Sequence, residues 1–317
     1  MRRMILAVVA ALMISLTGVA QERPINPTGT YCFVQRDTCS LYLDVYAPTP
    51  GSQTTIGDKA KPTVLFVFGG GFFEGERNNR GHQYWFKMLA DAGYSVVAID
   101  YRLGLKGFRG AGLNKAFINA THNAIDMAVD DLYAATLWLL EHGSEVGVDA
   151  RNIVISGSSA GAITVMQAEY ELANRTERCA LLPADFNYTG VMSFSGALYS
   201  FKGSPKYENE PCPTLLFHGT DDKIVPYKQL RLGRLFFGGA KPISKVYKKK
   251  GYNYNAYHYL GHGHEIANNM ILSFPEEIRF LETNVTRGQK RIIDTQVDDP
   301  DIKIPDWGKG DYKGLYK

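Results

Sequence analysis

The sequence predicts an α/β domain with a mostly parallel central sheet of about eight strands and helices on both faces. Short apolar runs recur at 64–68, 95–99 and 152–156, and uninterrupted runs of this length are typical of strands buried on both faces. Helical stretches separate the runs, which is the alternation expected of a parallel sheet. The 317 residues, 45% hydrophobic and 21% charged, are enough for one large domain and exclude a disordered or fibrous chain.

The elements are expected in alternating order along residues 21–286, which we predict to form one α/β domain. Two short strands should occupy 31–46, before a loop rich in Pro, Gly, Ser and Thr. The other strands are expected at 64–68, 95–99, 152–156, 191–194, 214–217 and 245–248 with 252–259, and the helices at 80–92, 122–142, 160–174, 227–238 and 265–284. Residues 287–317 are polar and contain two Pro and several Gly, so we expect an extended C-terminal tail on the surface.

The N-terminus has the pattern of a secretory signal peptide. Arg2 and Arg3 precede an uncharged apolar run, and small residues follow at Gly18 and Ala20. The run is shorter than the roughly 20 residues that a spanning helix needs. We therefore expect residues 1–20 to be removed and the protein to be exported, periplasmic or secreted, without a stable membrane span.

Four cysteines in an exported chain suggest disulfides, because bridges persist in oxidising compartments. Cys32 and Cys39 flank a short turn, which favours a local bridge between them and leaves Cys179 and Cys212 as a second pair. Sequence alone allows three connectivities, and buried free thiols are the alternative for the second pair.

The charge pattern limits the partners. The formal net charge is +3, and the densest basic run is only Lys248–Lys250. This gives no electrostatic support for nucleic-acid binding. The cysteine spacings match no zinc site, and we expect neither a metal nor another cofactor.

The most informative motif is Gly157-Ser158-Ser159-Ala160-Gly161 between a buried strand and a helix. On such a tight turn, small residues two positions before and after the central serine let the backbone pass, and the hydroxyl is exposed above the sheet edge. Ser159 is therefore our candidate nucleophile, and a structural Gly/Ser turn is the alternative.

A nucleophilic serine needs a base and an orienting acid, which follow it in the order acid, then His, on a sheet of this kind. Asp222 follows the strand 214–217, and His264 follows the strand that ends near 259. We favour these two residues. Asp221 and His262 are neighbours in the same segments and remain the alternatives.

Three consecutive glycines leave the strand 64–68. Without Cβ atoms, their backbone N–H groups can approach a substrate closely. We predict that Gly70, Gly71 and Ala160 form an oxyanion hole. A phosphate-binding loop is the alternative, but no Gly-Lys-Ser/Thr follows.

The remaining histidines are expected to be structural. His218 should brace a turn at its strand end. His258, His262 and His264 could together suggest a metal cluster, but their spacing is not that of two zinc ligands on a helix. Metal use would also leave Ser159 without a role.

With these motifs, the chain resembles the α/β-hydrolase superfamily. The likeness is to carboxylesterases, to hormone-sensitive-lipase-like esterases, and to bacterial acetyl and feruloyl esterases. The matching segments are 41–48, 68–72, 100–103, 148–161, 218–226 and 261–265. The resemblance implies an α/β-hydrolase fold with Ser159 as nucleophile, Asp222 as acid and His264 as base. The family often has His at the position of Phe68, so a hydrogen bond that supports the glycine loop is expected to be missing here.

The resemblance implies a serine carboxylic-ester hydrolase that forms an acyl-enzyme. Aromatic residues in loops 104–119 and 196–211 are expected to frame the pocket, namely Phe108, Phe117, Tyr199, Phe201 and Tyr207, together with Arg109. Export and these aromatic side chains favour a small-molecule or polysaccharide-linked ester as substrate, with an acetyl or feruloyl group. A serine peptidase of the same superfamily and a non-catalytic binding protein on a hydrolase scaffold are the alternatives.

Overall fold

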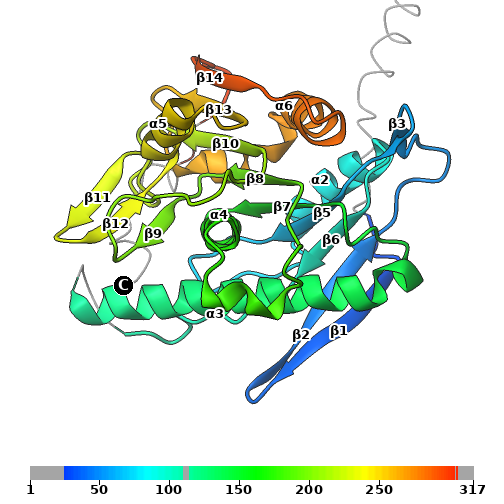
Figure 1. Cartoon of the computed structure of the whole chain (residues 1–317), viewed down its shortest axis with the longest axis horizontal. Coiled ribbons are helices and arrows are strands. Elements are labelled where there is room, and N and C mark those ends of the chain that lie inside the picture. The colour runs from blue at the N-terminus through cyan, green and yellow to red at the C-terminus, as the bar shows by residue number, and fades with distance from the viewer. Residues whose placement is uncertain (1–24, 110–113, 304, 306–317) are drawn as a thin grey trace, which may run out of the picture.

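A computed structural model of the chain describes residues 25–109, 114–303 and 305 (Figure 1). A nine-stranded sheet organises these residues. Its strands are β1 (Gly29–Arg36), β2 (Cys39–Tyr46), β5 (Thr63–Val67), β6 (Val96–Ile99), β7 (Ile153–Ser158), β8 (Gly190–Phe194), β10 (Thr214–Gly219), β13 (Tyr254–Tyr259) and β14 (Ile292–Val297).

The spatial order of the strands is β1-β2-β6-β5-β7-β8-β10-β13-β14. β2 pairs antiparallel with both β1 and β6, and every other neighbouring pair is parallel. The predicted fold class, an α/β domain with a mostly parallel sheet, is confirmed. The central strands β5, β7, β8 and β10 are buried at every position, as their apolar runs indicated.

Helices cover both faces of the sheet (Figure 1). They are α2 (Arg80–Asp91), α3 (Lys115–His142), α4 (Ala160–Ala173), α5 (Ala240–Lys250) and α6 (Phe274–Phe280), with the shorter turns η1 (Gly143–Val146), η2 (Glu177–Leu181), η3 (His264–Ile271) and η4 (Leu281–Thr286). The helices α3, α4 and α5 share one face. The hydroxyl of Tyr133 on α3 donates to the carbonyl of Ala168 on α4, and Tyr207 contacts both Tyr170 of α4 and Tyr247 of α5. On the other face, α2 and α6 are joined by a hydrogen bond between Trp85 and Glu277.

Two elements differ from the prediction: a predicted helix is a β-hairpin, and a predicted strand is part of a helix. Residues 227–238 were expected to be a helix, but they form a hairpin of β11 (Gln229–Leu232) and β12 (Leu235–Gly238) that pairs with β9 (Leu198–Ser200). The reason is the two-residue turn, because its first position, Gly233, has a φ of 61°, which suits a hairpin turn. The predicted strand 245–248 lies inside α5. A separate two-stranded hairpin is formed by β3 (Thr55–Ile56) and β4 (Lys59–Ala60).

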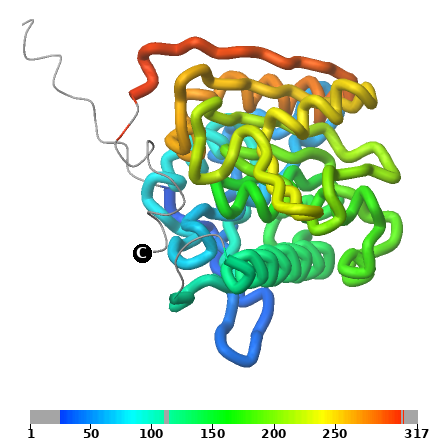
Figure 2. The backbone as a smooth tube through the Cα atoms, turned by 90° about the vertical axis from the view of Figure 1, so that its left-hand side faces the viewer, coloured from blue at the N-terminus to red at the C-terminus, as the bar shows by residue number. Residues whose placement is uncertain are grey.

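The C-terminal segment also differs from the prediction. Instead of an extended tail on the surface, residues 292–297 pair in parallel with β13 and form the last strand of the sheet. Figure 2 shows β14 running along one end of the molecule, while the turn between β1 and β2 projects at the opposite end. The alternating burial of β14 reflects its edge position, with every second side chain exposed to solvent.

The predicted signal peptide, residues 1–20, lies outside the described residues. Among those that are described, no helix is both long enough and apolar enough to cross a membrane.

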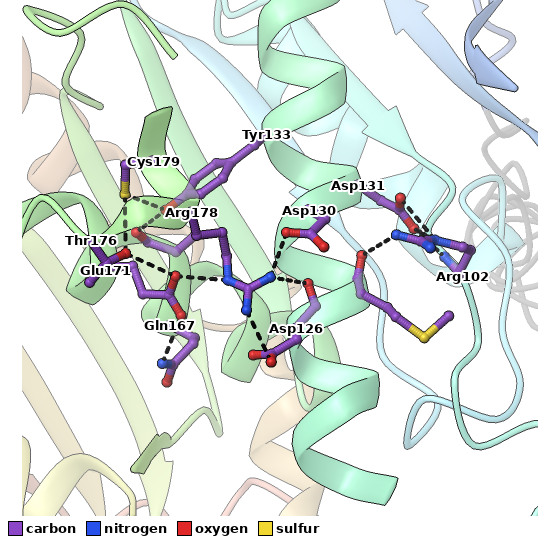
Figure 3. Close-up of polar contacts among 12 residues, drawn as sticks. Arg102, Asp126, Asp130, Asp131, Tyr133, Gln167, Glu171, Thr176, Arg178 and Cys179 are labelled. Carbon is purple, nitrogen blue, oxygen red and sulfur yellow. Dashed lines mark hydrogen bonds and ion pairs between the residues drawn. The ribbon is translucent and has the colours of Figure 1, made fainter. Parts of the chain in front are cut away.

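An ionic cluster ties the helices of one face together (Figure 3). Arg178, in η2, lies 3.0 Å from Asp126 and 2.6 Å from Asp130, both on α3. It also lies 3.0 Å from Glu171 at the end of α4. One guanidinium therefore links η2, α3 and α4 through charge-assisted hydrogen bonds, and this helps to fix α4, the helix that directly follows Ser159.

Candidate functional site

The strand-to-helix turn at Ser159 has a strained backbone. Ser159 joins β7 to α4 with φ 51° and ψ −114°, a conformation that a residue with a side chain rarely adopts. A Cβ on Gly157 would lie 2.4 Å from the backbone of Gly161, and one on Gly161 would lie 2.0 Å from the carbonyl oxygen of Val67. Only glycine fits at either position, so this motif serves the backbone path that exposes Ser159.

Ser159, His264 and Asp222 form one chain of hydrogen bonds. Oγ of Ser159 lies 2.7 Å from Nε2 of His264, and Nδ1 of His264 lies 2.8 Å from Oδ2 of Asp222. Since the carboxylate can only accept, Nδ1 carries the proton and Nε2 is left to accept from the serine hydroxyl. The structure thus brings together three side chains that are far apart in the sequence.

The two alternatives have other contacts. Asp221 is exposed, and its backbone N–H donates to the carbonyl of His262. The imidazole of His262 lies between Glu265, 2.9 Å from Nδ1, and the carbonyl of Asp299, 3.2 Å from Nε2. The geometry therefore selects Asp222 and His264 for the chain to Ser159.

Asp222 is buried and ionised. Burial alone would raise the pKa of its carboxyl, but the neighbouring imidazoles of His264 and His218 hold the pKa well below its usual range. Its other oxygen, Oδ1, accepts hydrogen bonds from the backbone N–H groups of Ile224 (2.9 Å) and Val225 (3.0 Å). These donors fix the carboxylate in the orientation that faces His264.

The glycine loop folds beside Ser159. Gly70, Gly71 and Phe72 all have positive φ, at 111°, 61° and 65°. A Cβ on Gly69 would lie 3.2 Å from the Cβ of Ser159, and one on Gly70 would lie 2.0 Å from the carbonyl of Glu74. The three predicted donors, Gly70, Gly71 and Ala160, line the same cavity as Ser159 and His264.

That cavity has a volume of about 970 Å³. Aromatic and aliphatic side chains from several separate segments supply most of its wall. Besides the glycine loop and the hydrogen-bonded chain, the lining includes Gly81, His82, Trp85, Phe117, Ile118, Thr121, Ile163, Tyr199, Lys223, Leu230, Leu235, Phe237, Ala267, Met270 and Ile271. A cavity of this size and character is typical of a small-molecule site.

The predicted aromatic frame is correct in part. Phe117 and Tyr199 line the cavity. Phe108 packs behind Phe117 and Phe201 packs against Tyr199, whereas Tyr207 lies among Tyr170, Tyr247 and Tyr252 in another part of the molecule. Arg109 does not belong to the lining.

The cavity walls formed by α2, the β11–β12 hairpin and η3 were not predicted from the sequence. Trp85 is held from behind by Glu277, whose Oε2 accepts a hydrogen bond of 2.7 Å from Nε1 of the indole. Burial raises the pKa of Glu277 to about 8. His82, beside Trp85, has a buried Nδ1 without a hydrogen-bond partner among the described residues, and burial lowers its pKa to about 4. A helix was expected at 80–92, but not that its first turns would face the cavity.

The disulfide predictions do not agree with the structure, in which all four thiols are free. Cys32 pairs with Tyr42 in the hairpin register, while Cys39 pairs with Arg36. At about 3.3 Å per residue, Cys39 is displaced by roughly 10 Å along its strand from the position opposite Cys32, beyond the ~7 Å between Cα atoms that a bridge tolerates. Cys179 contacts the hydroxyl of Tyr133 instead of Cys212.

The histidines considered for a metal cluster each contact a different acid. His258 pairs with Asp294, and His262 and His264 have the partners described above. Among the described residues, no group of three His, Cys, Asp or Glu side chains is arranged to hold a metal ion.

Two family models match overlapping parts of the chain, and both matches include Ser159. A model described as phospholipase/carboxylesterase matches residues 114–281, which is more than half of the chain. The chain belongs to the phospholipase/carboxylesterase family. A second model, of the carboxylesterase family, matches residues 18–173. Between them they include Ser159, Asp222, His264 and the glycine loop, so membership of this α/β-hydrolase family agrees with the fold and with the resemblance seen in the sequence.

Several curated proteins are similar to part of this chain. Human neuroligin-2 is 33% identical over 157 residues, which is 44% of this chain and 17% of that protein. Esterase LipI of Mycobacterium tuberculosis is 36% identical over 109 residues, 34% of this chain and 28% of LipI. Esterase E4 of Myzus persicae is 30% identical over 125 residues, 39% of this chain and 21% of E4. The matched segments thus span less than a third of these relatives.

Solved structures show the same fold over most of the chain. A thermophilic esterase from Thermogutta terrifontis, Est2, superposes with a TM-score of 0.55 at 19% identity, and the match covers 80% of this chain and 91% of Est2. Its propionate-bound form gives a TM-score of 0.54 at 20% identity, covering 80% and 94%.

Proposed function

We propose that this protein hydrolyses carboxylic esters by transferring the acyl group to Ser159 and then to water. The observation that carries the proposal is the chain of hydrogen bonds from Oγ of Ser159 through His264 to the ionised Asp222. A serine hydroxyl is a weak nucleophile on its own, and a base held in the correct tautomer by a carboxylate activates it.

In the acylation half, Oγ of Ser159 attacks the ester carbonyl as its proton passes to Nε2 of His264. The new C–O bond gives a tetrahedral intermediate with negative charge on the former carbonyl oxygen. When this intermediate collapses, the bond to the leaving alcohol breaks, and the imidazolium returns the proton to the alcohol oxygen. Asp222 stabilises the imidazolium without accepting its proton.

In the deacylation half, water takes the place of the alcohol. His264 accepts a proton from the water as its oxygen attacks the acyl carbon. The second tetrahedral intermediate then releases the carboxylic acid, and the proton on Nε2 returns to Oγ of Ser159. The two halves together consume one ester and one water and restore the protein.

The developing negative charge would be stabilised by the backbone N–H groups of Gly70, Gly71 and Ala160, which line the cavity beside Ser159. Ala160 is the first residue of α4, so its N–H also lies at the positive end of the helix dipole. One well-placed donor of this kind contributes about 3–4 kcal/mol to stabilisation of the transition state.

The direct test is turnover of p-nitrophenyl acetate by the wild type and by Ser159→Ala. We expect the variant to lose activity by at least about 1,000-fold while its melting temperature stays near that of the wild type. Ser156→Ala is the matched control, because Ser156 lies on the same strand and its buried hydroxyl has no hydrogen-bond partner within the described part of the chain. Equal activity in all three proteins would contradict the proposal.

The same assay tests the acid and the base. Asp222→Asn should lose most of its turnover, because the amide favours the wrong imidazole tautomer, and Asp221→Asn should keep it, since Asp221 is exposed and outside the hydrogen-bonded chain. A peptide panel and a fluorophosphonate probe separate the rival functions. A serine peptidase would cleave the peptides, and a non-catalytic binding protein would stay unlabelled.

For the substrate, we propose an ester of a carbohydrate, with an acetyl or feruloyl group. Aromatic side chains in the cavity wall support this, since Phe117 and Tyr199 offer ring surfaces suited to a sugar face or an aryl group. A panel of acetylated and feruloylated oligosaccharides, compared with p-nitrophenyl acetate, tests it. A preference of tenfold or more in kcat/KM for the simple ester over every sugar ester would reject it.

We also propose that the protein is exported after cleavage before Gln21, on the strength of the signal-peptide pattern in residues 1–20. Expression of the whole chain in a bacterium, followed by fractionation and intact-mass measurement, tests this. The expected product is a periplasmic or secreted chain that begins at Gln21, whereas a full-length cytoplasmic chain would contradict it.

A further inference from the structure

The glycine loop is held by a side chain from the neighbouring strand. Tyr101 follows β6, which pairs in parallel with the strand that leads into the loop. Its hydroxyl donates a hydrogen bond of 3.1 Å to the carbonyl oxygen of Phe68, and it lies 3.5 Å from the carbonyl oxygen of Gly69. The ring packs on that of Phe68, with 4.5 Å between centroids. Tyr101 is only 3% exposed, so this contact is shielded from water.

These two carbonyls set the direction of the loop's N–H groups. A peptide unit is planar and trans, so its C=O and the N–H of the next residue point in opposite directions. The carbonyl of Gly69 shares a plane with the N–H of Gly70, one of the proposed oxyanion donors. Holding the Gly69 carbonyl on the side of Tyr101 therefore directs the N–H of Gly70 to the other side of the loop.

The loop has backbone strain that needs such support. Phe72 has a φ of 65° although it is not glycine, and that conformation costs energy for a residue with a side chain. The carbonyl of Phe72 accepts a hydrogen bond from the N–H of Leu105. At the other end, Gly75 packs so closely that a Cβ there would lie 2.6 Å from the carbonyl oxygen of Gly69.

Phe68 cannot supply this support itself, because its side chain has no hydrogen-bond donor. The sequence comparison with the α/β-hydrolases led to the expectation that a loop-supporting hydrogen bond is missing here. The structure shows a buried hydroxyl that contacts the loop from outside the motif.

We propose that Tyr101 is a positioning residue for the oxyanion hole. Through the carbonyls of Phe68 and Gly69, its hydroxyl fixes the two peptide planes that carry the N–H groups of Gly69 and Gly70, and so aims the N–H of Gly70 at the substrate. The proposal rests on the proposed ester hydrolysis, since it assigns a role in stabilising that reaction's oxyanion. Tyr101 itself is not among the described residues that line the cavity, so its role would be indirect.

Tyr101→Phe tests it by removing one hydroxyl and keeping the ring. The matched control is Tyr133→Phe, because Tyr133 is also fully buried and its hydroxyl donates to a backbone carbonyl, that of Ala168, at 2.7 Å. We expect Tyr101→Phe to lower kcat for p-nitrophenyl acetate by about 10- to 100-fold with KM changed by less than threefold, since a misplaced oxyanion donor acts on the transition state. Tyr133→Phe should lower the melting temperature by a similar amount and leave kcat within twofold.

A rescue variant separates positioning from general loosening. In the Tyr101→Phe background, Phe68→His places a donor at the start of the loop, and we expect it to recover at least part of the lost kcat. An unchanged kcat in Tyr101→Phe, or equal losses in both tyrosine variants, would overturn the proposal. Because these comparisons are relative to the wild type, they are distinct from failure of the proposed function, which would appear as no ester turnover in the wild type itself and would reject both.

Discussion

Nε2 of His218 lies 3.3 Å from Oδ2 of Asp222, the same oxygen that accepts the hydrogen bond from His264. The N–H of Ala240 donates to Nδ1 of His218, so the proton of this imidazole is on Nε2. That single N–H faces both Asp222 and the carbonyl of Val225, which is 3.0 Å away. His218 therefore braces the turn that carries the acid, in agreement with its expected structural role.

Replacement of His218 by Phe should impair both stability and turnover. Two backbone groups, the Val225 carbonyl and the Ala240 N–H, would lose their buried partner, at a cost of about 2–4 kcal/mol in the free energy of unfolding. We expect kcat to fall by roughly tenfold, because Asp222 keeps its other donors but loses one of those that orient it. Urea unfolding and ester kinetics measure the two effects.

His258→Phe serves as the comparison, since His258 lies opposite His218 in the adjacent strand and pairs with Asp294 instead. Its kcat should stay within about twofold of the wild type. A His218→Phe protein with normal kcat would show that the contact with Asp222 has no catalytic consequence.

Glu277 should make the protein less stable as the pH rises. Burial raises the pKa of this carboxyl in the folded state to about 8, above its usual value of 4.5. The folded state therefore holds a proton that the unfolded state releases between these two values. This contribution is complete below pH 4.5 and is lost as the pH rises toward 8, by on the order of 1 kcal/mol per pH unit.

The protonated, neutral form of the Glu277 carboxyl also fits the hydrogen bonds around it. Trp85 donates to Oε2 of Glu277, and Ser273 lies 2.8 Å from Oε1 and 3.0 Å from the carbonyl of Asn269. A proton on Oε1 lets Glu277 donate to Ser273, which then donates to Asn269. Glu277→Gln preserves this pattern without a titratable proton, so its stability relative to the wild type should increase from pH 6 to pH 9. Parallel stability profiles of the two proteins over that range would contradict the assignment.

The contribution of His82 to the stability of the fold should depend on pH in the opposite direction. Burial lowers its pKa to about 4, below the ordinary value of 6.5, and the ring packs edge-on against Phe66 at 4.8 Å. The unfolded state binds a proton below pH 6.5 while the folded state does not, so stability is complete above pH 6.5 and declines as the pH falls toward 4. Between pH 7.5 and pH 5 the loss is about 2 kcal/mol.

In His82→Phe this loss should disappear. Urea unfolding of the wild type and the variant at pH 7.5 and pH 5 measures the difference. If the two proteins differ in free energy of unfolding by the same amount at both pH values, His82 is not the group that causes the loss of stability.

All four cysteines should titrate as thiols. In denaturant without reductant, the wild type is expected to react with four equivalents of Ellman's reagent, since each thiol is free. Cys32→Ser should change the free energy of unfolding by less than about 0.5 kcal/mol, because Cys32 is exposed and contributes no bridge. A titration of two equivalents would show that one pair is oxidised after all.

The parts of the site that could be predicted are those encoded in short local patterns. Gly157 and Gly161 mark the turn at Ser159 because no other residue fits the backbone there. Chain order after successive strands was enough to propose Asp222 and His264. The choice over Asp221 and His262 needed coordinates, because adjacent residues in a loop leave the sequence pattern nearly unchanged while their side chains point to different partners.

The parts that could not be predicted depend on long-range contacts. Residues 227–238 contain helix-favouring side chains, but pairing with β9 and the turn at Gly233 make them a hairpin. The segment 292–297 has the composition of a tail and becomes a strand only because β13 offers a free edge. Likewise, nothing in the residues around Tyr101 indicates that its hydroxyl reaches the carbonyl of Phe68.

The most direct test of the central claim is covalent labelling of the intact protein with a fluorophosphonate, followed by peptide mass mapping. We expect one phosphonyl group per chain, attached to Ser159, and a labelling rate at least 100-fold lower in His264→Ala. Absence of labelling in the wild type, or attachment to a different serine, would contradict it.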